Sequence, residues 1–195
     1  MNGKEEGVEL IHTRDRIISS ALKLFSRKGF RGTTIKDIAQ DVGLTEGAIY
    51  RHFESKEDLI EKITEMIVDE IDLLLSEEVM SKKNFVERIE ALVESLSCYA
   101  FNNPDHFRFL TLYHLLREDL LVSGADLPGK RILDMLRDAY RKGELDVQPE
   151  VALGIITGTV NRVFLLEEVG LSERDREELI EEMKRVILRA LNLSE

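Results

Sequence analysis

The chain has 195 residues, 43% of them hydrophobic, so it is long and apolar enough to fold around a core. It contains no run of 18 or more apolar residues and opens on an acidic segment, so neither a membrane span nor a signal peptide is expected. Its single cysteine, Cys98, excludes an internal disulfide and fits the reducing cytoplasm, where we expect the protein to act.

The formal net charge of −11 is unevenly distributed along the chain. Residues 12–56 carry nine Lys and Arg against five Asp and Glu, a net of +4, whereas residues 57–195 carry a net of −13. A slightly basic head on a strongly acidic body indicates that the head meets a polyanion and the body does not. A chance fluctuation in surface charge is the alternative explanation.

Three helices are predicted at the start of the chain. The first spans about residues 13–28 and ends at Gly29, because apolar residues recur in it at helical spacing. The second begins at Thr34, which resembles a capping-box residue with Asp37 three positions later. The third is short and covers about residues 45–53.

Residues 35–54 have the spacing of a helix-turn-helix. Ala39 is small, so the second and third helices can approach closely, and Gly43 lies where the turn needs a left-handed backbone. Ile38 and Ile49 are placed to hold the two helices together. This arrangement lays one helix across the DNA backbone and the next in the major groove.

The rest of the chain also predicts helices, without strand alternation or a hairpin dipeptide. The sequence therefore predicts an all-α fold of about nine helices, with a three-helix DNA-binding head at 1–56 and a larger effector-binding and dimerisation domain at 57–195. The later helices are expected over about 55–78, from Asn84, from Pro104, over 130–142 after a loop at 123–129, from Pro149, and from a cap at Ser172 to about Asn192.

The last two predicted helices have unusual surfaces. Residues 151–166 are apolar on nearly every side, and such a helix must be covered on nearly every side. The final helix is amphipathic. We expect a second copy of the chain to cover this pair and complete a four-helix bundle, the alternative being that both helices pack inside one chain.

The segment KGFRGTTIKDIAQDVGLTEGAIYRHFESKEDL, residues 28–59, resembles the DNA-binding head of the TetR family of transcriptional regulators. The resemblance covers about 50 residues, including Phe25. It implies a homodimeric, ligand-responsive repressor that binds a palindromic site on double-stranded DNA. The matching residues are Phe25, Gly29, Thr34, Ile38, Ala39, Gly43, Ile49, Tyr50, Arg51, His52, Phe53, Lys56 and Leu59.

This reading predicts the residues that contact DNA. The short third helix enters the groove by its first two turns, while residues at the starts of the second and fourth helices meet phosphates. Glu46 alternatively only complements its helix dipole. The predicted contacts are to bases from Thr45, Glu46, Gly47, Ala48 and Arg51, to phosphates from Thr34, Tyr50, His52, Lys56 and also Arg51, and to either from Lys36, the last by resemblance to the family.

The resemblance also implies a small-molecule effector site in the second domain, and the sequence predicts a largely apolar effector. Aromatic side chains at helical spacing are equally explained as core. Thr157 and Asn161 are polar residues on an apolar helix and need partners if buried. The predicted effector-binding residues are Tyr99, Phe107, Tyr113, His114, Met135, Tyr140, Thr157, Asn161 and Phe164.

The chain contains none of the short motifs that mark common enzymes, such as a P-loop, GxSxG or HExxH, so no enzymatic activity and no cofactor are expected. His114 and Glu118 share a helix face, but two ligands do not make a metal site. Two other functions stay open. One is a helical ligand-binding module without physiological DNA binding, and the other is a DNA-binding activator or a DNA-binding protein without an effector.

Overall fold

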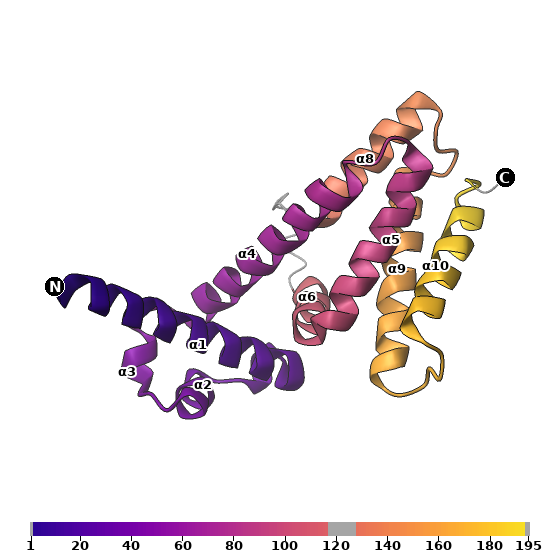
Figure 1. Cartoon of the computed structure of the whole chain (residues 1–195). Helices are drawn as coiled ribbons and strands as arrows, with labels where there is room; N and C mark the ends of the chain where they lie inside the picture. Colours follow the sequence, from indigo (N-terminus) through magenta and orange to yellow (C-terminus); the bar gives the residue numbers. More distant parts are fainter. Residues whose placement is uncertain (1, 117–127, 194–195) are drawn as a thin grey trace. The chain divides into compact units, whose positions relative to one another are not determined.

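The structure is a computed structural model that describes the backbone of residues 2–116 and 128–193 and the side chains of residues 12–114 and 129–193. Every regular element in these residues is a helix, as the sequence predicts (Figure 1). The elements are α1 (Asn2–Gly32), α2 (Ile35–Val42), α3 (Glu46–Ile49), α4 (Lys56–Leu74), the π-helix η1 (Leu75–Val79), α5 (Phe85–Asn102), α6 (Pro104–Leu116), α8 (Pro128–Lys142), α9 (Pro149–Glu168) and α10 (Arg176–Ala190).

Most helix starts follow from local chemistry, and some predicted boundaries were wrong. The Thr34–Asp37 capping box and the Asn84 cap are present. α1 begins well before residue 13, although Gly29 does interrupt it with a non-helical backbone (φ 73°, ψ 167°). α10 is capped by Asp175 rather than Ser172, because the Asp175 carboxylate accepts the Glu177 amide hydrogen at 2.8 Å.

The predicted loop at 123–129 falls mostly outside the described residues. Only its last two residues are described, and they are the first residues of α8, which therefore begins at Pro128 rather than Lys130. The fourth helix also ends differently from the prediction. It stops at Leu74 and continues as one π-helical segment to Val79, instead of running as an α-helix to about residue 78.

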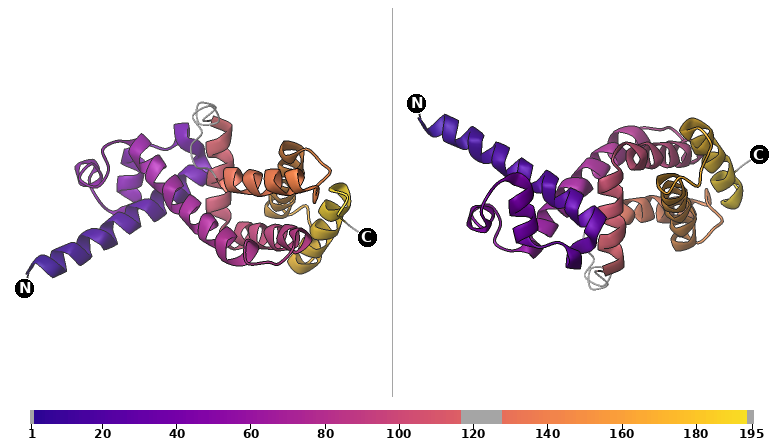
Figure 2. Two further views of the ribbon diagram at one scale, coloured as in Figure 1. Left: turned by 90° about the horizontal axis from the view of Figure 1, so that it is seen from above. Right: turned by 90° about the horizontal axis from the view of Figure 1, so that it is seen from below.

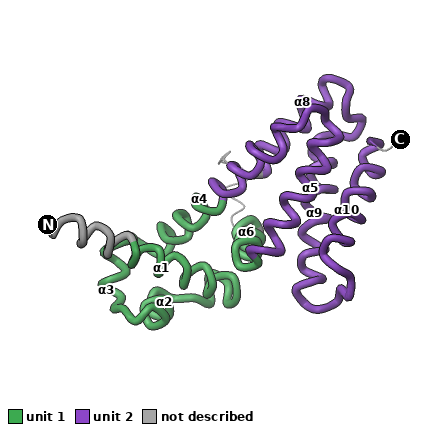
Figure 3. Tube along the Cα trace, in the orientation of Figure 1, with its two compact units in different colours: residues 1–67, 104–124 green, residues 68–103, 125–195 purple. Residues whose placement is uncertain are grey.

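The chain forms two compact units (Figure 3). Unit 1 comprises Met1–Ile67 and Pro104–Gly124, and unit 2 comprises Val68–Asn103 and Ala125–Glu195. Helix α6, from the middle of the chain, therefore packs with α1 in the first unit (Figures 1 and 2). Helix α4 is continuous across the boundary, so its first three turns belong to unit 1 and its last residues to unit 2.

The core of unit 1 contains a cluster of aromatic rings from α1 and α6. The Phe30 ring lies 5.1 Å from Phe109 and 5.4 Å from Phe25, edge to face in both cases. Tyr113 stacks on Phe109 with 6.2 Å between ring centroids. All four side chains are buried, so α6 is fixed to α1 by contacts that bury large apolar areas.

The core of unit 2 is built on α5. This helix contacts η1, α9 and α10, while α8 packs on α9. Ile89 and Leu92 of α5 and Phe164 of α9 are completely buried. Another side of α9 faces outward, because Val151 is 53% exposed and Gly154 and Gly158 are also exposed. The single chain therefore leaves much of this apolar helix uncovered.

The aromatic cluster predicts which substitution unfolds the first unit. Replacing Phe109 by alanine removes a completely buried ring that touches three others, so we expect a loss of about 3–5 kcal/mol in the free energy of unfolding. Met80→Ala is the matched control, because Met80 is 49% exposed and should cost far less. Urea denaturation followed by circular dichroism measures both, and equal losses would contradict the role of the cluster.

Candidate nucleic-acid interface

The turn between α2 and α3 has the backbone that the sequence predicts. Gly43 ends α2 in the left-handed conformation, with φ 72° and ψ 33°. The Gly43 amide donates to the carbonyls of Ala39 and Gln40, near the end of α2. The Leu44 amide also donates to the Ala39 carbonyl, at 2.8 Å. The Thr45 hydroxyl then caps α3 by accepting the Ala48 amide hydrogen at 3.2 Å. These bonds fix the direction in which α3 leaves the turn.

Buried side chains hold α3 against the rest of the head. Ile49 is completely buried and Phe53 is 2% exposed, while Ile38 and Ala39 of α2 are buried on the facing side. Ala48 is also buried, at 8% exposure. Its methyl group therefore packs inside the head and not on the outward side, which does not favour the predicted contact between Ala48 and a base.

The outward side of α3 and the residues that flank it carry most of the predicted DNA-contacting residues. Thr45, Glu46, Gly47 and Arg51 are exposed, and Tyr50 is 52% exposed despite its large ring. An added Cβ at Gly47 would meet its nearest neighbour, the Thr45 hydroxyl, only at 4.0 Å, so the backbone is open to solvent there. The head thus presents a slim polar ridge that protrudes from an apolar base.

Two predicted residues lie at the start of α2. Thr34 and Lys36 are exposed, but the Thr34 hydroxyl is engaged with the Asp37 carboxylate at 2.6 Å. Hydrogen bonds from the Thr34 hydroxyl and amide lower the pKa of Asp37, so its carboxylate stays charged beside the helix start. A phosphate that approaches this end of α2 is repelled by the Asp37 carboxylate, and the nearby cations Lys28 and Lys36 offset the repulsion.

His52 and Lys56 differ from the exposed set. His52 is half-buried beside the Phe53 ring, with 6.4 Å between ring centroids. The Lys56 ammonium points back to the end of α1, where it donates to the carbonyls of Phe30 at 2.8 Å and Thr33 at 3.3 Å. Both residues are half-buried, unlike the exposed residues of the ridge.

Two arginines of α1 also shape this surface, although the sequence reading did not single them out. Arg16 donates to the Val42 carbonyl at 2.7 Å and so stabilises the end of α2. Arg14 lies over the Phe53 ring, 5.3 Å from its centroid. The sequence places Arg14 and Arg16 on the polar face of the first predicted helix. Only the fold shows that they face α2 and the residues after α3.

Comparison with known proteins agrees with this geometry. The sequence profile described as "Bacterial regulatory proteins, tetR family" matches residues 17–63, the segment that contains α2, α3 and the start of α4. A TetR-family transcription regulator from Marinobacter aquaeolei superposes with a TM-score of 0.80 over 98% of each chain, at 15% sequence identity. Residues 17–63 therefore match the head of a TetR-family regulator, and the chain as a whole has the fold of the solved structure from Marinobacter aquaeolei.

Two curated relatives show how far the similarity extends. The nucleoid occlusion factor SlmA of Photobacterium profundum is 29% identical over 168 residues, which are 80% of this chain and 86% of that protein. The IcaR protein of Staphylococcus aureus, a negative transcriptional regulator of the biofilm operon icaADBC, is 32% identical over 100 residues, about half of either chain (51%).

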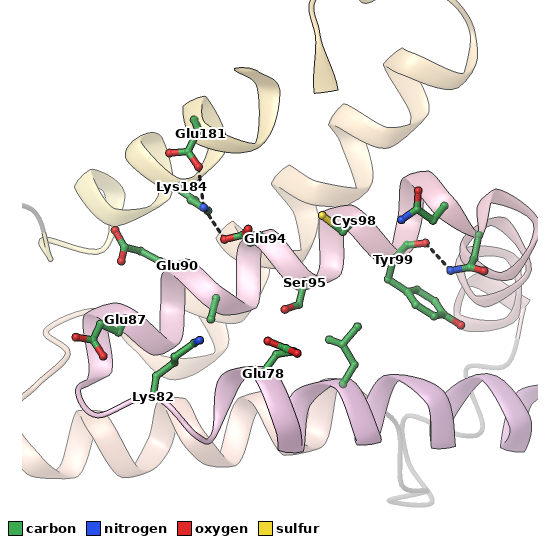
Figure 4. Close-up of a pocket in the computed structure, with 14 residues that line it drawn as sticks. Glu78, Lys82, Glu87, Glu90, Glu94, Ser95, Cys98, Tyr99, Glu181 and Lys184 are labelled. Carbon is green, nitrogen blue, oxygen red and sulfur yellow. Dashed lines mark hydrogen bonds and ion pairs between the residues drawn. The ribbon is translucent and has the colours of Figure 1, made fainter. Parts of the chain in front are cut away.

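Unit 2 has a pocket of about 860 Å³ between the end of α4, η1, α5 and α10 (Figure 4). Its lining is polar and largely acidic. The Lys184 ammonium bridges Glu94 and Glu181, both at 2.7 Å, and these hydrogen bonds raise its pKa although burial opposes the change. The residues that line the pocket are Leu74, Glu78, Lys82, Glu87, Glu90, Ala91, Glu94, Ser95, Cys98, Tyr99, Asn102, Asn103, Glu181 and Lys184.

Tyr99 is the one predicted effector residue that lines this pocket. Burial raises the pKa of its phenol, as does its hydrogen bond to Glu70 at 2.7 Å. Cys98 lines the pocket next to it. Its side chain is exposed, and partial burial together with Glu94 raises the pKa of its thiol.

The other predicted effector residues are divided between the two units. Phe107, Tyr113 and His114 lie on α6 in unit 1, where Tyr113 belongs to the aromatic core. In unit 2, Met135 and Phe164 are buried.

The remaining three are polar residues, and none of them is without a partner. Thr157 donates to the Leu153 carbonyl at 2.8 Å and Asn161 is half-buried, also with a partner. The hydroxyl of the 38%-exposed Tyr140 accepts from Gln148 in a separate hollow of about 530 Å³.

The turn glycines give a matched pair of stability predictions. Gly43→Ala places a Cβ in open space but in a left-handed backbone, so we expect a loss of about 1–2 kcal/mol in the free energy of unfolding. Gly47→Ala adds the same methyl group to the first turn of α3, where its nearest neighbour is 4.0 Å away, and should cost nothing. Urea denaturation of the two variants measures the difference, and equal stabilities would contradict the conformational role of Gly43.

Proposed function

We propose that this protein is a ligand-responsive repressor of the TetR family that acts in the cytoplasm and binds a palindromic operator as a homodimer. The observation that carries the proposal is the ridge on α3, where exposed polar residues stand on a base of completely buried ones. The surrounding residues 12–56 have a net charge of +4 in an otherwise acidic chain. Such a surface suits a short helix inserted into the major groove of double-stranded DNA.

The exposed residues divide by the chemistry that they offer to DNA. Arg51 is long enough to reach a guanine edge or a phosphate, and the exposed Tyr50 hydroxyl can donate to a phosphate. Thr45 and Glu46 stand at the start of the ridge, and the open backbone at Gly47 permits close approach to the bases. The proposed contact set is Thr34, Lys36, Thr45, Glu46, Gly47, Tyr50 and Arg51, with half-buried His52 at its edge.

The outward side of α9, together with α10, is the proposed dimer interface. Val151, Gly154, Gly158 and Arg162 recur every three or four residues along this side and are all exposed. Glycines let a partner helix approach closely. Val186 extends the exposed apolar surface onto α10 at 46% exposure. A second copy of the pair would cover both helices in a four-helix arrangement.

By length and composition α9 is also able to cross a membrane, a test that helices of soluble proteins pass as well. The position of Arg162 argues against that role. An arginine near the middle of a bilayer costs about 2.5–3.5 kcal/mol, whereas a protein partner can supply acceptors for its guanidinium. We therefore assign this side to a second subunit rather than to lipid.

We propose that a small-molecule effector bound by residues 57–195 favours a dimer in which the two α3 helices no longer match the spacing of the operator half-sites. Residues 1–56 are then the functional DNA-binding domain, although α6 packs with them in one compact unit. The chemical class of the effector stays a prediction. The pocket lined by η1, α5 and α10 is polar, whereas the effector expected from the sequence is largely apolar.

DNA binding is tested by fluorescence anisotropy, with duplexes from upstream of the protein's own gene and from random-site selection, at several salt concentrations. We expect Arg51→Ala to weaken binding about tenfold or more and to reduce the salt dependence. Gly47→Ala should weaken binding without lowering stability, because its methyl group enters the gap between ridge and bases. Glu173→Ala, an exposed change in unit 2, is the control. Wild-type protein that binds no duplex in a salt-dependent way would favour a ligand-binding module without a DNA role.

The proposed dimer interface is tested by a substitution that introduces a charge on the outward side of α9. Nothing lies within 4 Å of a Cβ added at Gly158, so Gly158→Glu should leave one chain folded while it places a carboxylate in the interface. We expect sedimentation velocity to show a monomer for this variant and a dimer for the wild type. Gly129→Glu, where the space is equally open, is the matched control and should stay dimeric. A wild-type monomer, or a dimeric Gly158→Glu variant, would contradict this interface.

A further inference from the structure

We propose that Glu46 selects a cytosine in each half-site of the operator, an assignment that rests on the DNA binding proposed above. Glu46 is the first residue of α3, and its side chain is exposed. In a helix-turn-helix, the first residues of the second helix are the ones that contact base edges in the major groove. The carboxylate of Glu46 is thus carried by the part of the ridge that meets bases.

The head does not use this carboxylate for its own structure. The start of α3 is already capped, because the Thr45 hydroxyl accepts the Ala48 amide hydrogen at 3.2 Å. At the start of α2, by contrast, the Asp37 carboxylate accepts the Thr34 amide hydrogen at 2.8 Å. In the part of the chain whose side chains are described, the Glu46 carboxylate forms neither a hydrogen bond nor an ion pair. A helix of four residues also has only a small dipole for a carboxylate to complement. The acceptor oxygens of Glu46 are therefore available to a ligand.

The chemistry of the base edges decides which base suits a carboxylate. An ionised carboxylate accepts hydrogen bonds and donates none. In the major groove, guanine presents two acceptors, thymine presents an acceptor and a methyl group, and adenine presents an acceptor beside its amino donor. Cytosine presents only the donor of its N4 amino group. It is the one base whose edge offers Glu46 a donor without an acceptor beside it.

The negative charge makes Glu46 reject other bases more than it favours cytosine. A carboxylate that loses its hydration at the DNA surface without gaining a donor costs more free energy than a neutral group would. The phosphates repel it as well. The head tolerates this repulsion because residues 12–56 carry a net charge of +4, with Arg51 and Lys36 among the exposed cations. Glu46 therefore contributes to specificity chiefly by weakening binding to the wrong sequences.

Random-site selection with the wild type and with Glu46→Gln tests the assignment, because a glutamine amide pairs with adenine instead of cytosine. We expect one position in each half-site to change from cytosine to adenine, while the rest of the motif stays the same. Glu61→Gln is the matched control. It removes the same charge from an exposed residue of α4 in the same unit and should select the wild-type motif.

Fluorescence anisotropy gives a second measurement on the selected duplex. Replacing the cytosine in both half-sites should weaken wild-type binding about tenfold or more. Glu46→Ala should lose this preference. It should also bind a scrambled duplex more tightly than the wild type at the same salt concentration, because the repulsion between the carboxylate and the phosphates is gone.

The outcomes separate base selection from a structural role. A cytosine that changes to adenine in Glu46→Gln supports the assignment. A role limited to the helix dipole would instead lower the urea midpoint of Glu46→Gln and leave the motif unchanged. An unchanged motif, or a changed position that is not cytosine in the wild type, would overturn the assignment while DNA binding stands. A wild-type protein that enriches no motif would overturn the proposed function together with this assignment.

Discussion

A helix of four residues has no stability of its own, and this constraint governs the head of the molecule. α3 exists because Ile49 and Phe53 are buried and because the turn before it is closed by backbone hydrogen bonds around Gly43. The packing fixes the direction of α3 as well as its conformation. Any residue on its outer side is therefore presented in one orientation, which a surface that reads DNA requires.

The same constraint explains why charged residues around α3 make structural contacts within the head. Arg16, Asp37 and Lys56 each bond to a helix end, and Arg14 lies on the Phe53 ring. Charged residues that a sequence pattern assigns to a polyanion thus partly serve to complete short helices. The ridge is left with fewer cations than the sequence count implies, so we expect each exposed one, such as Arg51 or Lys36, to matter more for DNA affinity.

The fold could be predicted from the sequence where local chemistry decides it. Thr34 with Asp37, the left-handed Gly43 and the Asn84 cap are all short-range features, and the structure contains each of them. The TetR-type head followed from the same residues. Ser172 was the wrong cap because Asp175 offers a carboxylate three residues later, and spacing alone does not rank two acceptors.

The effector site could not be predicted in the same way. Helical spacing shows that an aromatic residue is buried but not what covers it, so Tyr113 was indistinguishable from a ligand contact until α6 was seen against α1. The acidic pocket needed the π-helix and α10 brought beside α5, a long-range arrangement that no local pattern specifies. Lys56 shows the same limit, because its position predicts a phosphate contact and only its partners reveal the bond to Phe30.

The central claim is that the ridge on α3 reads a palindromic operator as one half of a dimer, and random-site selection with the full-length protein tests it most directly. The account predicts an enriched motif with two inverted half-sites whose centres lie about one helical turn of DNA apart, roughly 34–36 Å. The motif should lose its information content when Arg51 is replaced by alanine. Selection that enriches no motif, or one unaffected by Arg51→Ala, would contradict the claim.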